Sequence, residues 1–372
     1  MNGYFDNAAT SYPKPQGVAE WICKYLSTGG SYGRAAHSKS HEVSKVVELA
    51  RDMLASKVGV SNPENLIFCS SATEGANVLV MGLLKPKMRV FVDAMSHNAV
   101  MRPLQFLKSK LDLEVVFFPC FADGFIDTSR ISPSMANDID FAIVNFVSNV
   151  NGVVQDIESI KAALGNVPIM LDASQAIGKL DFSVEKLGVD HLFFTCHKGL
   201  MGPTGVGCYY SKCLASMQPL KYGGTGSKSS SLEMPDFLPD KFEAGTPNIL
   251  GIYGLVGALK DNVSKGHTKS DFLELISNIE RLPGVTLYGA SDASRQSDLF
   301  SFCHSTLPND DIAYRLDKQY NIQVRSGLHC SPLAHKTLGT FPSGLVRCSS
   351  STFHTAGDLQ YLYQSLKEIV GG

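Results

Sequence analysis

A lysine follows a short apolar stretch near the middle of the chain, where it could act as a nucleophile. Leu192 to Phe194 has the length and aromatic content of a buried strand, and the polar stretch Thr195 to Lys198 follows it. Burial and a neighbouring cationic side chain both disfavour an ammonium group, so they lower the pKa of a lysine in such a position. An amine that is free near neutral pH can form an imine with a carbonyl compound. The alternative is a surface lysine in a glycine-rich turn.

A carboxylate at the end of another predicted strand favours the first interpretation. Asp172 follows the strand predicted from Pro168 to Leu171, and Gln175 comes three residues later. A carboxylate there could pair with the protonated ring nitrogen of an aromatic cofactor and make that ring a better electron sink. Asp172 could also simply cap a helix.

Three further sites follow predicted strands. Ser70 to Gly75 lies where a strand gives way to a helix, so its backbone N–H groups could bind a phosphate, or it could be an ordinary helix cap. His97 could stack on a planar ring, although a lone loop histidine is more often only solvated. Asn149 lies beyond another strand end. A separate explanation for each residue does not account for their shared position at strand ends.

These residues sit in an alternation of strands and helices, which predicts an α/β fold. Such an alternation gives a mostly parallel sheet covered by helices on both faces, with ligands bound at the carboxyl ends of the strands. The predicted strands are Leu66 to Cys69, Arg89 to Asp93, Leu113 to Phe118, Phe141 to Val147, Pro168 to Leu171, Leu192 to Phe194 and Val206 to Tyr210.

The domain organisation is predicted from changes in this pattern. Residues 1–15 read as an extended arm, 16–262 as a large domain and 263–372 as a smaller α+β domain with strands near 285–287, 299–303, 322–325 and 344–349. Residues 222–248 carry no periodicity, which is typical of a functional or flexible segment.

Composition excludes several classes of function. The formal charge of −2 and the absence of a Lys/Arg block argue against nucleic acid as a partner, and no apolar run approaches the length of a membrane span. The N-terminus lacks the pattern of a signal peptide. Nine cysteines without a Cys-x-x-Cys pair favour a reducing cytoplasm and predict no metal site.

The motifs together resemble class V, fold-type I pyridoxal-phosphate (PLP) enzymes of the cysteine desulfurase family. The resemblance covers nearly the whole chain and predicts the PLP-dependent transferase fold, with a large seven-stranded sheet and a smaller C-terminal domain. The motifs are Tyr4-Phe-Asp-Asn-Ala-Ala-Thr10, Ala72-Thr73-Glu74, Ser96-His97-Asn98, Ser148-Asn149 with Gly152, Asp172-Ala173-Ser174-Gln175, His197-Lys198, Ala244-Gly245-Thr246-Pro247, Val324-Arg-Ser-Gly-Leu-His-Cys330 and Val346-Arg347.

The resemblance implies a role for each candidate residue. Lys198 would hold PLP through an imine, Asp172 would pair with the ring nitrogen, and His97 would stack on the ring. Asn149 and Gln175 would contact the ring oxygen or the substrate. The phosphate would be held by Ala72, Thr73, Thr195, His197 and, across a homodimer interface, Thr246 of the partner. Arg347 would bind the substrate carboxylate, because a guanidinium can form two parallel hydrogen bonds to a carboxylate. Arg325 is the second candidate for this role.

Cys330 decides which reaction the resemblance implies. In desulfurases a cysteine at this position takes sulfur from the PLP-bound substrate as a persulfide and leaves alanine. The short spacing from Arg325 to Cys330 resembles the group with a fixed, short cysteine loop. Only the thiolate form of Cys330 is nucleophilic, and His329, the preceding residue, could be expected to deprotonate it. Adjacent side chains of an extended chain point to opposite faces, however, so the sequence does not predict that His329 activates Cys330. The alternative is that Cys330 is one more small buried cysteine.

The substrate and the acceptor of the sulfur stay open. After Arg347 the chain reads Cys-Ser-Ser-Ser-Ser-Thr-Phe, where family members usually have an apolar residue and a glycine. The first interpretation is a cysteine desulfurase that converts L-cysteine to L-alanine and passes the sulfur to Cys330 as a persulfide, with a sulfur-acceptor protein as a candidate partner. The alternatives are a selenocysteine lyase, another class V aminotransferase or lyase, and a partner-dependent sulfur-relay protein.

Overall fold

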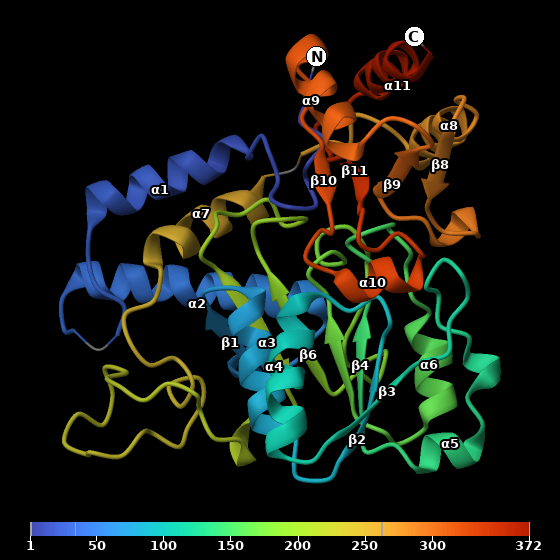
Figure 1. Ribbon diagram of the computed structural model, residues 1–372. Helices are drawn as coiled ribbons and strands as arrows, with labels where there is room; N and C mark the ends of the chain where they lie inside the picture. The colour runs from blue at the N-terminus through green and yellow to red at the C-terminus, as the bar shows by residue number, and fades with distance from the viewer. Residues whose placement is uncertain (1, 34, 262, 372) are drawn as a thin grey trace.

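A seven-stranded sheet forms the centre of the larger part of the molecule (Figure 1). The computed structural model describes residues 2–33, 35–261 and 263–371, so residue 262, at the predicted domain boundary, lies outside the described residues. The strand order is β1-β7-β6-β5-β4-β2-β3, in which β7 pairs antiparallel with both of its neighbours and the other pairs are parallel. The carboxyl ends of β1 to β6 therefore point to one edge, as the alternating pattern predicted. The strands of this sheet are β1 (Leu66–Cys69), β2 (Arg89–Val92), β3 (Glu114–Phe117), β4 (Phe141–Asn145), β5 (Ile169–Asp172), β6 (His191–Thr195) and β7 (Gly207–Ser211).

Helices cover both faces of this sheet because its strands are apolar on both sides. On one face α3 (Ala72–Leu83) and α4 (Asn98–Lys110) pack against side chains such as Ile67 and Phe193. On the other face α2 (Ser38–Val58), α6 (Ile157–Leu164) and α7 (Ile249–Lys260) pack against the alternate residues, such as Leu192 and Phe194. Helix α1 (Gln16–Thr28) lies against α7, outside this layer.

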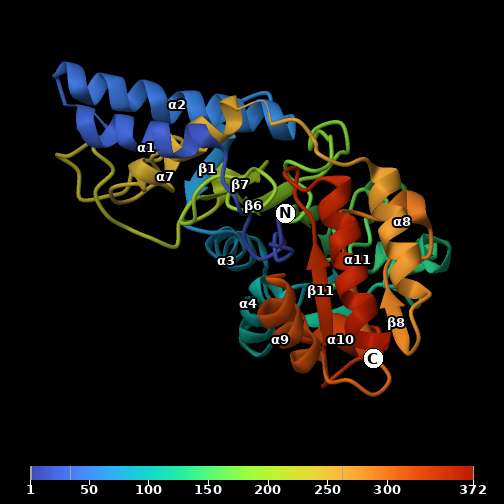
Figure 2. The same cartoon turned by 90° about the horizontal axis from the view of Figure 1, so that it is seen from above.

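The C-terminal part forms a second, smaller α+β unit. Its four-stranded antiparallel sheet has the order β10-β11-β9-β8, and α8, α9 and α11 enclose a separate apolar core with it. Figure 2 shows this unit on the side of the molecule away from α1 and α2. The elements are α8 (Lys269–Glu280), β8 (Val285–Tyr288), β9 (Leu299–His304), α9 (Asn309–Tyr320), β10 (Arg325–Gly327), α10 (Pro332–Thr337), β11 (Leu345–Ser349) and α11 (Ala356–Gly371).

One sequence-based expectation about local structure was wrong, and two short helices were not predicted. The strand expected from residue 322 to 325 begins only at Arg325, because the backbone of Gln323 bonds to the N-terminal arm: Phe5 N–H donates to Gln323 O, and Gln323 N–H donates to Gly3 O. Helix α10 and α5 (Pro133–Asn137) were not predicted, since helices this short carry no readable periodicity.

The aperiodic segment after β7 has the irregular backbone that its sequence predicted. Residues 217–248, all of them described, form no helix or strand. The segment is tied to the large domain at its end, where the Glu243 carboxylate bonds Arg51 of α2 at 2.8 and 2.9 Å and accepts from Phe68 N–H at 2.7 Å.

Candidate active site

One cavity of about 340 Å³ lies at the carboxyl edge of the large sheet, between that sheet and the smaller unit. Residues after β1, β2, β4, β5 and β6 line it, and residues of β10, β11 and the loop before α10 complete it. The sequence-predicted residues in its lining are Ala72, Thr73, His97, Asn149, Asp172, Gln175, Thr195, His197, Lys198, Arg325, Cys330 and Arg347.

Lys198 follows β6 in a tight turn, in which Met201 N–H donates to Lys198 O at 2.8 Å. Gly199 is required there, because a Cβ at this position would lie 2.2 Å from the backbone oxygen of Ile177. The pKa of Lys198 is lowered to about 8, and burial is the main cause. The Arg347 charge also lowers this pKa, whereas the Asp172 carboxylate raises it. The amine is thus partly free near neutral pH, as the sequence pattern predicted.

Asp172 is the last residue of β5 and is buried. Its Oδ1 accepts from Ser174 N–H at 2.9 Å. Burial raises the pKa of this carboxyl, while Ser174 and Lys198 lower it. A buried carboxylate in the wall of the cavity is suited to a protonated ring nitrogen.

His97 has a fixed orientation because it caps α4. Its Nδ1 accepts from Ala99 N–H at 3.0 Å, which leaves Nε2 as the protonated nitrogen of a neutral ring. Burial and the charge of Lys198 lower the pKa of His97 to about 4. A neutral imidazole at the cavity wall can stack on a flat ring without repelling a cationic one.

The first turn of α3 forms an anion-binding cradle. Ser71 caps the helix by accepting from Glu74 N–H at 3.2 Å, so helix geometry leaves the N–H groups of Ala72 and Thr73 facing outward without intrahelical partners. Thr195, the last residue of β6, and His197 line the same cavity. The Nδ1 atom of His197 is buried and has no hydrogen-bond partner among the described residues.

Asn149 and Gln175 both make contacts that the sequence did not predict. Asn149 Nδ2 donates to His329 O at 2.8 Å, and its Oδ1 accepts from Ser331 Oγ at 2.8 Å. Gln175 Nε2 donates to Ala8 O at 2.8 Å. Asn149 thereby anchors the loop on both sides of Cys330, and Gln175 anchors the N-terminal arm.

Cys330 is exposed, so it is not a small core residue like Cys196 or Cys348. The argument about His329 assumed an extended loop, and the structure differs. His329 and Cys330 have φ values of 48° and 57°. Such a left-handed conformation is strained for residues other than glycine, and the Asn149 contacts and a bond from Asn98 N–H to Cys330 O at 2.9 Å hold it. Burial lowers the pKa of His329 to about 2, so its ring is neutral.

Arg347 and Arg325 meet at a carboxylate that sequence analysis did not single out. Arg347 Nη2 donates to Asp6 Oδ1 at 2.8 Å, and Arg325 Nε donates to Asp6 Oδ2 at 3.2 Å. Arg347 Nη1 also donates to Asn149 O at 2.9 Å, whereas its Nε has no partner in the part of the chain that is described. The motif Tyr4 to Thr10 contained the signal, but only the fold brings Asp6 to β11.

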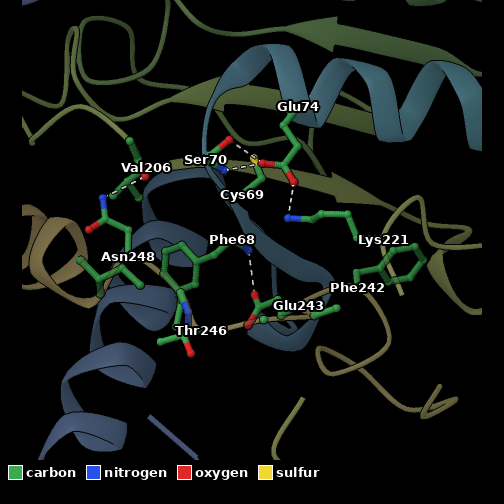
Figure 3. A pocket seen from close by; sticks show the side chains of 15 residues that line it. Phe68, Cys69, Ser70, Glu74, Val206, Lys221, Phe242, Glu243, Thr246 and Asn248 are labelled. Atoms are coloured by element: carbon green, nitrogen blue, oxygen red, sulfur yellow. Dashed lines mark hydrogen bonds and ion pairs between the residues drawn. The ribbon is translucent and has the colours of Figure 1, made fainter. Parts of the chain in front are cut away.

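Thr246 lies outside this cavity. It is exposed and lines a separate hollow of about 130 Å³, shown in Figure 3, whose wall also includes Ser70 and Glu74 at the start of α3. There Glu74 bonds to Ser70 and to Lys221, and Glu243 bonds to Phe68 N–H (Figure 3). Thr246 does not contribute to the site of its own chain, which agrees with the expectation that it serves another subunit and does not test it.

The residues around the cavity fit a phosphorylated aromatic aldehyde such as PLP. They offer an amine of lowered pKa, a buried carboxylate and a helix N-terminus in one cavity. Buried polar atoms without partners among the described residues point to a missing polar group as well: Gln175 Oε1 and His197 Nδ1.

Comparisons with known proteins agree with this geometry. The profile of the class-V aminotransferase family matches residues 3–362. A probable cysteine desulfurase of Methanothermobacter thermautotrophicus is 30% identical, over 99% of this chain and 94% of the relative. A cysteine desulfurase of Yersinia pestis is 29% identical, over 98% and 93%. The apo structure of a cysteine desulfurase from Thermococcus onnurineus superposes with a TM-score of 0.91 at 28% identity, over 99% and 94%.

The chain belongs to the class-V aminotransferase family, and it is an enzyme. The family and the fold type predicted from the motifs are thereby confirmed, and the family is PLP-dependent. The comparisons also support the prediction of a cysteine desulfurase. Within residues 2–33, 35–261 and 263–371, no helix combines the length and apolarity needed to cross a bilayer. The same residues contain no cluster of three or more His, Cys, Asp or Glu side chains suited to a metal ion.

Proposed function

We propose that this protein is a PLP-dependent cysteine desulfurase that converts L-cysteine to L-alanine and takes the sulfur on Cys330 as a persulfide. The observation that carries the proposal is that an exposed thiol and a lysine of lowered pKa line one cavity. Related proteins named cysteine desulfurase, which align with nearly the whole chain, support it.

Each residue would have a defined task in this reaction. Lys198 would hold PLP, which when bound stabilises negative charge at the substrate's α carbon. Asp172 would keep the ring nitrogen protonated, and neutral His97 would cover the ring. The N–H groups of Ala72 and Thr73 would hold the phosphate, as helix N-termini do for anions.

The sulfur transfer itself would be performed by Cys330. Its thiolate attacks the substrate sulfur, an S–S bond forms, and the C–S bond breaks with its electron pair left on carbon, which takes up a proton to give alanine. The Asn149 contacts fix the loop so that the thiol is held at the cavity, where a positioned nucleophile has a high effective concentration. A thiol acceptor, or an acceptor protein, would then reduce the persulfide and regenerate the enzyme.

Replacing Cys330 tests the proposal. Cys330→Ala should keep the absorbance of bound PLP but lose release of alanine from cysteine without any keto acid. Cys213→Ala, which removes another exposed thiol away from the cavity, should behave as wild type. After brief turnover, mass spectrometry should find one added sulfur on the Cys330 peptide. Alanine release by Cys330→Ala at the wild-type rate would refute a thiol-dependent desulfurase, and activity on selenocysteine alone would make the enzyme a selenocysteine lyase.

We also propose that the enzyme works as a homodimer in which Thr246 contacts the phosphate in the partner's site. Its exposure outside the cavity of its own chain supports this arrangement. Sedimentation of the PLP-loaded protein should give a dimer, and Thr246→Val should weaken PLP retention. A fully active, PLP-loaded monomer would contradict the proposal.

A further inference from the structure

The N-terminal arm joins the two parts of the active site. Phe5 pairs with the smaller unit, donating its N–H to Gln323 O at 2.8 Å and accepting from Ser349 N–H at 2.7 Å. A few residues later, Ser11 N–H donates to the carbonyl of His197, next to Lys198, at 3.0 Å. The arm is thus held at both ends, and the position of Asp6 between them is defined by its backbone as well as by its side chain.

Asp6 uses both carboxylate oxygens on the two arginines of the cavity. Oδ1 bonds Arg347, whose side chain is 3% exposed, and Oδ2 bonds Arg325, whose side chain is 44% exposed. Asp6 itself is 15% exposed, so its charge acts strongly on the buried Arg347 guanidinium and more weakly on the solvent-screened Arg325 guanidinium. Within the described part of the chain, Asp6 is the ion-pair partner of both Arg347 and Arg325.

The charges of this triad determine what kind of molecule it can accept. Two guanidinium groups and one carboxylate leave a single positive charge, which one substrate carboxylate neutralises. A second acidic group on the substrate would face the Asp6 carboxylate and compete with it for Arg325, whose Nε is already bonded. Placing like charges against an unwanted ligand is a common source of specificity.

We propose that Asp6 is a specificity-determining residue that restricts the site to amino acids with a single carboxylate, by occupying the arginine that would otherwise bind a second one. This inference rests on the proposed function, because it takes Arg347 as the site of the substrate's α-carboxylate. It adds that Arg325 is a latent second carboxylate site, and that the chemical class of the substrate is a monocarboxylic amino acid.

Binding of simple acids tests this inference without turnover. Propionate carries one carboxylate and succinate two, and the dissociation constant of each can be measured by calorimetry on the PLP-loaded protein. Asp6→Asn keeps the shape of the side chain and an oxygen that can accept from Arg347, but it removes the charge. This variant should bind succinate about fivefold more tightly relative to propionate, as expected for one additional partly exposed ion pair.

Two further variants make the result specific. Asp6→Asn combined with Arg325→Gln should lose the gain, because the second carboxylate would again have no partner. Asp311→Asn, which removes a carboxylate from an exposed aspartate–arginine pair on α9, should leave the ratio unchanged.

The possible results separate this inference from the proposed function. An unchanged succinate-to-propionate ratio in Asp6→Asn, or a gain that survives Arg325→Gln, would overturn the role of Asp6 and leave Arg347 as the carboxylate site. Propionate binding that is undiminished in Arg347→Ala would overturn both the role of Arg347 and the inference that depends on it. Neither result depends on desulfuration, which the Cys330 variants test separately.

Discussion

The lowered pKa of Lys198 leads to a quantitative prediction about its reactivity. Because only the free amine is nucleophilic, a pKa of about 8 instead of 10.5 increases the fraction of free amine at pH 7 about 300-fold. Burial is the main cause, and the Asp172 carboxylate opposes it by stabilising the ammonium form. Removing that charge in Asp172→Asn should therefore lower the pKa of Lys198 further, so that reactivity begins at a lower pH.

Competitive acetylation of the PLP-free protein measures this titration. Trace amounts of acetic anhydride are added at a series of pH values, and mass spectrometry quantifies acetyl groups on each lysine peptide. Modification of Lys198 should rise through a midpoint near pH 8 in the wild type. Lys318 provides a control within the same sample, because Asp317 raises its pKa above 10.5.

Two results would refute the reasoning. A Lys198 midpoint at or above that of Lys318 would show that the cavity does not desolvate the amine. A midpoint that rises in Asp172→Asn would show that the carboxylate does not stabilise the ammonium form. An unaltered Lys318 midpoint in the variant would confirm that the change is local.

Two further predictions concern buried charges. Arg347→Ala should reduce kcat/KM for cysteine by an amount equivalent to about 2–5 kcal/mol while PLP stays bound, because the substrate carboxylate loses its charged partner. An unchanged kcat/KM in steady-state assays would show that another residue binds the carboxylate. Glu243→Ala should destabilise the large domain by about 3–5 kcal/mol in urea unfolding, because it leaves the Arg51 guanidinium, 1% exposed, without its buried partner. The matched variant Glu114→Ala removes a carboxylate that is 61% exposed and should cost less than about 1 kcal/mol, so equal losses in the two variants would contradict the argument.

The positions of the residues that we propose to bind PLP could be predicted because they follow strands in sequence. Asp172 ends β5 and Lys198 comes shortly after β6, and these strands pair in parallel. Once an alternation of apolar runs and amphipathic helices predicts a parallel sheet, residues at successive strand ends must meet at one edge. The local motif at Ala72 likewise predicts its own structure, since a serine cap before a helix fixes where the first free N–H groups lie.

The rest of the site was decided by the tertiary structure, because it depends on contacts between segments far apart in the chain. The sequence contained Cys330, but its exposure and its left-handed backbone follow from hydrogen bonds to Asn149 and Asn98 across the cavity. Asp6 lies in a segment with neither helical nor strand periodicity, and only the bridges that join the arm to the smaller unit bring it to Arg347. No local pattern records such a pairing, since its energy comes from two charges that become neighbours only when the chain has folded.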